Sequence, residues 1–549
     1  MWCPRRHHVN ARSDFPRADS SATAAHGSDA PALVDVAIIG TGFAGLGMAI
    51  QLKQHGIDNF LVFEKAGSVG GTWRDNHYPG CACDVQSHLY SFSFAPNPDW
   101  SRMYSPQPEI RAYLERCTDE FGVRPHVRFH HELTRAAFNE AAGAWDLDMA
   151  DGRRYRARVL ISGMGGLSRP SWPNIPGIET FQGKAFHSQL WEHDYDLRGK
   201  RVAVIGTGAS AIQFVPQIAP KAGRVDLYQR TPPWILPKPD RKVSRAEHWL
   251  FRHLPFTQKL MRTSIYWMLE SRVLGFVIHP KLMKAVERMA RSHIKRRIAD
   301  PVLREKVTPD YTIGCKRILI SNDYYPALTR ENVDVITTGI ARVEPNAIVT
   351  TDGTRREVDC LIFGTGFHAT DPFPRGVLRG SQGVDIVDAW DKHGAEAYLG
   401  TTVSGFPNFF MVVGPNTGLG HSSMVFMIES QVAYIVDALK SMRAHNVATI
   451  DVRLDVQRRF NDSIQKRLSN AIWSAGGCVS WYLDPKTGKN TTLWPGFTWQ
   501  FRRATAHFRL ADYRTRPMAV PKGVPLRVPA RTVPTAAENT ANEEALDRA

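Results

Sequence analysis

Cysteine is scarce in this sequence of 549 residues: there are seven, scattered along the chain, and none forms a CxxC pair. The scarcity and the odd number predict no disulfide framework and no metal site, and they favour a reducing compartment. Long apolar runs are also missing, since the most hydrophobic internal stretch, 265–278, is interrupted by Glu270 and Arg272. Segment 1–29 lacks the apolar core of a secretory signal. We therefore expect a cytoplasmic protein without a membrane-spanning helix.

The length and composition instead indicate a large globular protein. A chain of this size needs two or three domains, and 43% hydrophobic residues exclude wholesale disorder. Lys and Arg outnumber Asp and Glu by 69 to 53, which gives a net charge of +16. Such an excess is typical of proteins that bind nucleic acid, an anionic membrane surface or phosphorylated ligands.

The first recognisable unit begins near residue 32. An apolar, β-branched strand at 34–39 runs into the glycine motif 40–45, a helix follows, and a second strand, 60–63, ends at Glu64. Strand, GxGxxG, helix, strand and acid together indicate a βαβ dinucleotide-binding unit, in which the helix N-terminus faces a pyrophosphate and the acid faces a ribose. The residues assigned to this cofactor are Gly40, Gly42, Phe43, Ala44, Gly45, Glu64 and Lys65.

The same pattern recurs 166 positions later, with a strand at 201–205, a glycine turn, a helix and a strand at 225–228. This second unit ends in Arg230 and Thr231 instead of an acid, which favours the 2′-phosphate of NADPH over the free ribose of NADH. The turn residues assigned to this cofactor are Gly206, Thr207, Gly208, Ala209 and Ser210.

Two nucleotide sites in one chain indicate FAD and NADPH, with hydride passing from the nicotinamide to the flavin. A disulfide reductase would have the same two units and a redox-active cysteine pair beside the flavin. Here Trp73 stands where such a motif would begin, and Cys81 and Cys83 are separated by one residue. We interpret both cysteines as ordinary loop residues.

Several motifs beyond the two turns resemble one family. The segment 181–191 fits the pattern FxGxxxHxxxW, with Glu192 where that family has Pro or Asp. A second signature runs from Gly70 to Asp84, and two more occupy 315–325 and 406–416. Over roughly residues 32–510 the sequence resembles the Baeyer–Villiger monooxygenases. The related flavin-containing monooxygenases share both turns but usually lack the tryptophan that ends the first pattern.

The resemblance implies roles for particular residues. Arg317 resembles the active-site arginine that lies over the flavin, and Asp84 resembles the carboxylate that holds it. Lys316 resembles a further contact of the 2′-phosphate, whereas His187 and Trp191 resemble a hinge-like pair at the domain junction. The remaining cofactor contacts that the resemblance implies are Gly71, Thr72, Trp73, Tyr78 and the late tryptophan Trp481.

The resemblance also implies the activity: NADPH-dependent insertion of one oxygen atom of O₂ into a ketone through a C4a-peroxyflavin, giving an ester or lactone. The substrate would be a small lipophilic ketone. Two alternatives stay open, namely a sulfide or amine oxygenase with the same cofactors, and a flavin NADPH oxidase that oxygenates nothing. A permanently charged Arg317 held by Asp84 favours oxygenation, because an anionic peroxide needs a fixed cation in a dry site.

The predicted fold is therefore α/β, with two Rossmann-like domains, the FAD domain interrupted by the NADPH domain, and a helical insert. We place the FAD domain at 31–168 and 351–515, and the NADPH domain at 169–350. Residues 1–30 and 516–549 are predicted to be disordered tails.

The insert, 241–310, carries much of the excess charge, with sixteen Lys and Arg against six Asp and Glu, a net of +10. We interpret it first as a helical cap with a solvated face. A second interpretation is contact with an anionic membrane. We expect no nucleic-acid partner, because no recognition motif accompanies the charge.

Overall fold

Two mainly parallel sheets form the framework of the protein. A computed structural model describes residues 32–370, 373–478 and 480–518. The first sheet runs in the order β17-β4-β5-β6-β1-β2-β3, with β18 paired to β6. Its strands are β1 (Ala32–Ile39), β2 (Phe60–Phe63), β3 (Val127–Arg128), β4 (Leu133–Asn139), β5 (Ala144–Met149), β6 (Arg154–Ser162), β17 (Leu378–Arg379) and β18 (Phe409–Met411).

The second sheet is wholly parallel and has the order β12-β9-β8-β16-β7. Its strands are β7 (Lys184–His187), β8 (Arg201–Ile205), β9 (Arg224–Tyr228), β12 (Val333–Ile336) and β16 (Cys360–Phe363). In each sheet the central strand that precedes a glycine turn, β1 or β8, is apolar and largely buried. This is the pattern of parallel strands covered on both faces.

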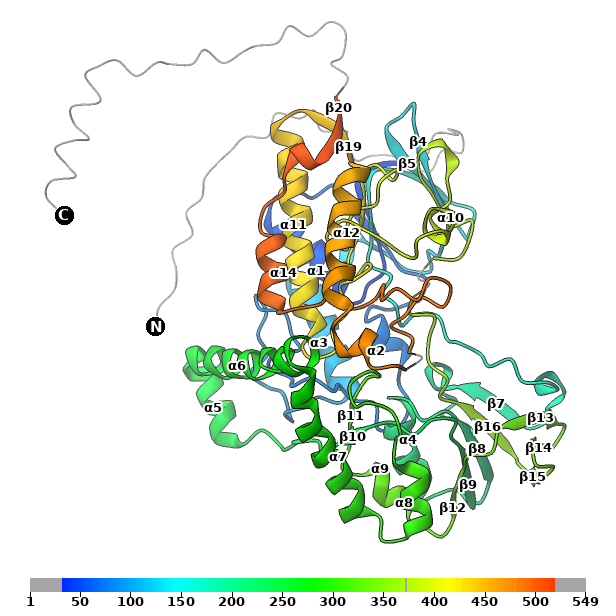
Figure 1. Ribbon diagram of the computed structural model, residues 1–549. Coiled ribbons are helices and arrows are strands. Elements are labelled where there is room, and N and C mark those ends of the chain that lie inside the picture. The colour runs from blue at the N-terminus through cyan, green and yellow to red at the C-terminus, as the bar shows by residue number, and fades with distance from the viewer. Residues whose placement is uncertain (1–31, 371–372, 479, 519–549) are drawn as a thin grey trace, which may run out of the picture.

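Smaller sheets occupy the periphery. Their strands are β10 (Ile235–Leu236) with β11 (Leu319–Ile320), β13 (Ile340–Glu344) with β14 (Ala347–Thr350) and β15 (Arg355–Glu357), and β19 (Val447–Val452) with β20 (Tyr513–Pro517). Figure 1 shows β13–β15 at the outer edge of the second sheet, far from the β19–β20 pair.

Helices cover both sheets. Figure 1 shows α1, α11, α12 and α14 gathered beside the first sheet, whereas α4, α8 and α9 accompany the second. These helices, together with the others except the first three of the basic insert, are α1 (Phe43–Gln54), α2 (Thr72–Asp75), α3 (Gln107–Glu120), α4 (Ala211–Ile218), α8 (Pro301–Val307), α9 (Tyr324–Leu328), α10 (Ile386–Asp391), α11 (Met424–Ala444), α12 (Leu454–Leu468), α13 (Ile472–Ala475) and α14 (Thr498–Ala504).

The basic insert is helical, as predicted. It contains α5 (Arg245–His253), α6 (Pro255–Glu270) and α7 (Met283–Arg297), and it ends with α8. Ser244 and Glu247 form a capping box at the start of α5, which fixes where the helix begins. Among the described residues no helix is long and apolar enough to cross a membrane.

The structure departs from the predicted boundaries in two places. Strand β16 pairs with β8 and β7 of the second sheet, although the boundary at residue 351 places it in the first domain. The chain thus returns to the first sheet only after β16. The sequence could not place this boundary, because a short apolar strand followed by glycine fits either sheet equally well. Arg516 and Pro517 end β20, inside the predicted C-terminal tail; residues 1–31 and 519–549 lie outside the described residues.

The cysteine prediction was wrong in one respect. Cys315 and Cys478 form a disulfide, with Cα atoms 6.2 Å apart and 163 positions between them in the sequence. Their spacing carries no local signal, so the pair appears only when the fold brings the two loops together. Cys81 and Cys83 are free and buried, in agreement with their interpretation as loop residues.

Candidate active site

The turn after β1 can be built only with glycine. Gly40 has a φ of +97°, and a Cβ on it would lie 2.9 Å from the carbonyl oxygen of Gly163, which follows β6. A Cβ on Gly45 would lie 1.9 Å from the Gly40 oxygen. The first turn of α1 therefore packs directly against the end of β1, which is the arrangement that exposes helix N–H groups to a phosphate.

A second glycine loop meets this turn. Gly71 has a φ of +51°, and its Cβ would lie 2.9 Å from Gly42 Cα. Gly42 is the N-cap residue of α1 and offers no side chain to the free N–H groups of the helix. Two side-chain-free backbones thus border one space at a helix N-terminus, and this cradle fits the pyrophosphate of a dinucleotide.

Glu64, at the end of β2, is buried and firmly held. Its Oε2 accepts hydrogen bonds from the Thr41 backbone N–H at 3.1 Å and from the Thr41 hydroxyl at 2.5 Å. Its Oε1 lies 2.9 Å from Arg74 Nη1. The carboxylate is therefore fixed beside the glycine turn, where an adenosine ribose would lie.

One large cavity follows this turn and extends along the loops that come after β6 and β18. The predicted residues that line it are Gly40, Gly42, Phe43, Ala44, Glu64, Lys65, Gly71, Thr72, Trp73, Arg317 and Trp481. The sequence analysis missed other lining residues, among them Tyr90, Met164, Thr370, Thr417, Leu419 and Met424. They come from loops without a cofactor-binding pattern, so only their position in the fold reveals them.

Arg317 and Asp84 form an ion pair at this cavity. They are 233 positions apart in the sequence, and their side chains are 34% and 33% exposed. Burial by itself would raise the pKa of Asp84, but the charge and hydrogen bond of Arg317 outweigh it and hold that pKa below its ordinary value. The charge of Asp84 in turn raises the pKa of Arg317. The cavity thus has a permanent cation with a fixed orientation.

Tyr482 is a site residue that the sequence analysis did not assign. It is buried, and the nearby positive charge of Arg317 acts to lower its pKa. Burial outweighs that charge and raises the pKa of Tyr482 to about 12, so the phenol stays neutral. The Cys315–Cys478 disulfide joins the segment that carries Arg317 to the segment that carries Tyr482. Asp84 thus pairs with the guanidinium, and Tyr482 lies near it.

The second glycine turn lies at the second sheet. Gly206 has a φ of +106°, and its Cβ would lie 2.5 Å from the Gly364 oxygen, so β16 contacts this turn as β6 contacts the first. The Thr207 hydroxyl donates to the Thr231 carbonyl at 3.1 Å. Burial, and after it the charge of Arg230, lowers the pKa of Lys316. A pair of cations beside a glycine turn fits a phosphate.

The 181–191 motif lies against the second unit. His187 is buried on β7, and its Nδ1 accepts the Gln189 N–H at 3.1 Å. The Trp191 ring packs 5.2 Å from that of Phe214 on α4. Glu192, the residue that departs from the family pattern, forms a 2.5 Å ion pair with Lys184 of the same motif.

Gln213 of α4 links the two units, and the sequence analysis did not single it out. Its Oε1 accepts from the Tyr78 hydroxyl at 2.9 Å, and its Nε2 donates to the Ala82 carbonyl at 3.0 Å. The sequence analysis assigned Tyr78 to a cofactor, but Tyr78 does not line the large cavity. Its hydroxyl instead contacts Gln213 of the second unit.

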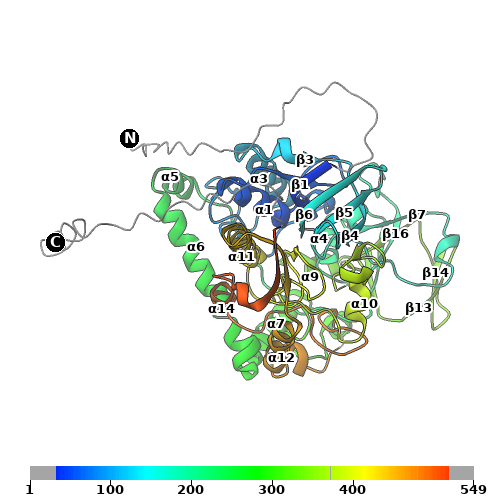
Figure 2. The ribbon, with the colours of Figure 1, turned by 90° about the horizontal axis from the view of Figure 1, so that it is seen from above.

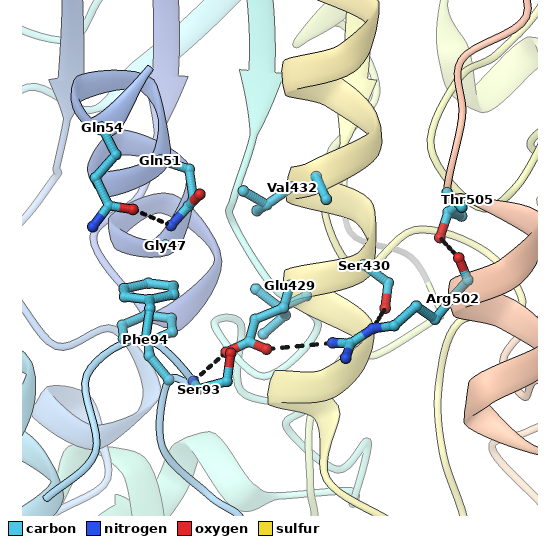
Figure 3. A pocket seen from close by; sticks show the side chains of 14 residues that line it. Gly47, Gln51, Gln54, Ser93, Phe94, Glu429, Ser430, Val432, Arg502 and Thr505 are labelled. Atoms are coloured by element: carbon cyan, nitrogen blue, oxygen red, sulfur yellow. Dashed lines mark hydrogen bonds and ion pairs between the residues drawn. The ribbon is translucent and has the colours of Figure 1, made fainter. Parts of the chain in front are cut away.

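A smaller hollow lies between α1, α11 and α14, away from the glycine turns (Figure 3). Glu429 points across it, accepts the Ser93 N–H at 2.5 Å and lies 3.4 Å from Arg502. Arg502 also donates to the Ser430 hydroxyl at 3.3 Å. These polar groups bond to one another and join α14 to α11.

The fold and this site are those of a flavin-dependent monooxygenase. A family model described as pyridine nucleotide-disulphide oxidoreductase matches residues 37–250. A Baeyer–Villiger monooxygenase of Pseudomonas aeruginosa is 59% identical over 486 residues, which cover 88% of this chain and 92% of that protein. The chain therefore belongs to the Baeyer–Villiger monooxygenase family.

Solved structures agree with this assignment. Cyclohexanone monooxygenase from Rhodococcus sp. Phi1, bound to NADP⁺, superposes with a TM-score of 0.81 at 28% identity, covering 89% of this chain and 100% of that one. OTEMO in complex with FAD and NADP gives a TM-score of 0.79 at 26% identity, covering 88% and 99%. The predicted α/β fold, enzyme class and cofactor pair are confirmed.

Proposed function

We propose that this protein oxidises a small lipophilic ketone to an ester or lactone. In balance, one ketone, one O₂, one NADPH and one proton give the ester, NADP⁺ and water. The observation that carries the proposal is the Arg317 cation, fixed by Asp84 at the cavity that both glycine loops border. FAD, when bound, supplies the redox chemistry that connects NADPH to O₂.

The first unit provides the residues that would hold FAD. The close approach of Gly42 and Gly71 supports this assignment, because a Cβ on Gly71 would lie only 2.9 Å from Gly42 Cα.

The second unit provides the residues that would hold NADPH. Arg230, Lys316 and the Thr231 hydroxyl surround a position suited to the 2′-phosphate. Lys316 directly precedes Arg317, so the coenzyme phosphate and the active-site cation are held by one short segment.

Arg317 provides the electrostatic catalysis. Insertion of oxygen beside a carbonyl places negative charge on oxygen atoms as the carbonyl carbon becomes tetrahedral. A guanidinium oriented by Asp84 stabilises that charge without reorienting, and its high pKa prevents it from giving up a proton. Asp84 acts as a positioning residue for Arg317.

The test is product analysis with the purified flavoprotein. A panel of cyclic, linear and aromatic ketones is incubated with NADPH under ¹⁸O₂, and the products are identified by mass spectrometry. We expect an ester or lactone with one ¹⁸O atom from at least one ketone. When the same test is applied to Arg317→Ala, the matched control is Arg342→Ala, which removes an ion-paired arginine on β13, far from the cavity.

Other products would contradict the proposal. Sulfoxides or amine oxides formed without any ester would indicate a heteroatom oxygenase. Hydrogen peroxide equal to the NADPH consumed, across the whole panel, would indicate an oxidase.

A further inference from the structure

Helix α6 has one face that no other part of the described structure covers. Its inner face packs on the body of the protein through Ile265 and Leu269, which contact Leu89. On the opposite face Phe256, Leu260 and Trp267 are 65%, 64% and 57% exposed. Spacings of four and seven residues put these three on one side of the helix.

Helix α5, which directly precedes α6, also exposes an aromatic side chain, Trp249, which is 54% exposed. We call Trp249, Phe256, Leu260 and Trp267 the apolar strip. Figures 1 and 2 both show α5 and α6 at the outer edge of the molecule, away from the two sheets. The strip is therefore accessible to a large flat partner.

The charges around the strip are positive. Arg245 and Lys259 are exposed on the same two helices, whereas Arg252 of α5 pairs with Asp99 at 2.6 Å. Of the two acids there, Glu247 accepts hydrogen bonds from Arg241 at 2.6 and 2.8 Å. Glu270 is buried and accepts from the Thr498 N–H and hydroxyl at 2.8 and 2.9 Å. No exposed acid of α5 or α6 is thus left to offset the cations.

We propose that the apolar strip docks on the surface of an anionic lipid bilayer. Tryptophan and phenylalanine favour the boundary between lipid headgroups and acyl chains, and neighbouring Lys and Arg are attracted to anionic headgroups. Two observations favour a bilayer over a second copy of this chain. Segment 241–270, which contains both helices, has six Lys and Arg against two Asp and Glu, so two copies in contact through it would repel each other. The strip residues of α6 also form a narrow, convex line along that helix, unlike a self-complementary protein interface.

The test is co-sedimentation of the full-length flavoprotein with vesicles. One set is phosphatidylcholine alone, and the other contains about 30% phosphatidylglycerol, at about 0.1 M salt where electrostatic attraction acts over about 10 Å. We expect binding about tenfold stronger to the anionic vesicles, and loss of most of it at about 0.5 M salt.

Two variants distinguish binding through the apolar strip from nonspecific adsorption to vesicles. Phe256→Ser/Leu260→Ser/Trp267→Ser should weaken binding about tenfold or more, because it removes the apolar contact area. The matched control is Leu33→Ser/Leu190→Ser/Val384→Ser, which changes three exposed apolar residues elsewhere and should bind like the wild type. NADPH oxidation measured without vesicles should be unchanged in both variants, so the outcome is independent of the proposed oxygenation.

Three results would overturn the proposal. The wild type could fail to bind anionic vesicles at low salt, or the strip variant could bind as well as the wild type. Sedimentation velocity could also show a dimer that the strip variant abolishes, which would assign the strip to a second copy of the chain.

Discussion

Replacement of Arg317 by alanine should abolish useful oxygenation while leaving the cofactors in place. Two effects combine. Loss of one preorganised electrostatic stabiliser costs about 10²–10³ in rate. In addition, Asp84 remains as a carboxylate without its cation, since its ion pair is with Arg317.

The second effect can be estimated from the geometry. A carboxylate and an oxyanion that accept hydrogen bonds from opposite sides of one guanidinium are about 8 Å apart. At an effective dielectric constant of about 20, Asp84 would therefore repel a developing oxyanion by about 2 kcal/mol. That repulsion corresponds to about thirtyfold in rate. Arg317→Ala should therefore lower ester formation by about 3×10³ to 3×10⁴, and Arg317→Ala/Asp84→Asn should recover about thirtyfold of it.

The assay separates this step from the others. Anaerobic stopped-flow absorbance gives the rate of flavin reduction by NADPH, which we expect to stay within about threefold of wild type. Chromatography of the ester under O₂ gives the oxygenation rate. Ester formation within about tenfold of wild type in Arg317→Ala, or a double variant slower than the single one, would refute the electrostatic role of Arg317.

Three further predictions concern the cofactor sites and the disulfide. Arg230→Ala and Lys316→Ala should each lower kcat/KM for NADPH by about 10- to 100-fold, as expected for a lost charged hydrogen bond. Both variants should leave kcat/KM for NADH nearly unchanged. Equal losses with both coenzymes would contradict the assignment of these residues to the 2′-phosphate. Gly71→Ala should yield protein largely free of FAD by absorbance at purification, because its φ of +51° and the 2.9 Å approach to the neighbouring glycine exclude a Cβ; a full flavin content would show that the loop adapts. Cys315 and Cys478 are bonded, so reduction should add two thiols to those that titrate in the denatured protein; an unchanged thiol count would contradict the disulfide. Reduction should also lower the free energy of unfolding by about 2–4 kcal/mol in urea titrations, and a Cys315→Ser/Cys478→Ser variant should show no such change.

The two nucleotide-binding units could be predicted from the sequence because each is local. A strand, a glycine turn, a helix and a second strand fit within about 30 residues, and the requirement for glycine at a turn such as Gly40 leaves a direct mark in the sequence. The change from Glu64 in the first unit to Arg230 in the second is equally local. For the same reason the helical insert and its charge could be predicted with good boundaries.

The position of the apolar strip was only partly predictable. Helical periodicity in the sequence reveals that α6 has two apolar sides, but not which of them packs on the protein. The buried contacts of Ile265 and Leu269 decide this, and they leave Phe256 and Trp267 outside.

The sequence by itself thus determined the two cofactor units, their order and the family, because those signals lie within short segments. Tertiary structure decided which sheet receives β16, which cysteines meet, and that Asp84 and Tyr482 both lie near Arg317. It also decided that α6 presents its apolar strip outward. Each of these joins residues far apart in the chain, and distance along the chain carries no information about contact until the sheets and loops have packed.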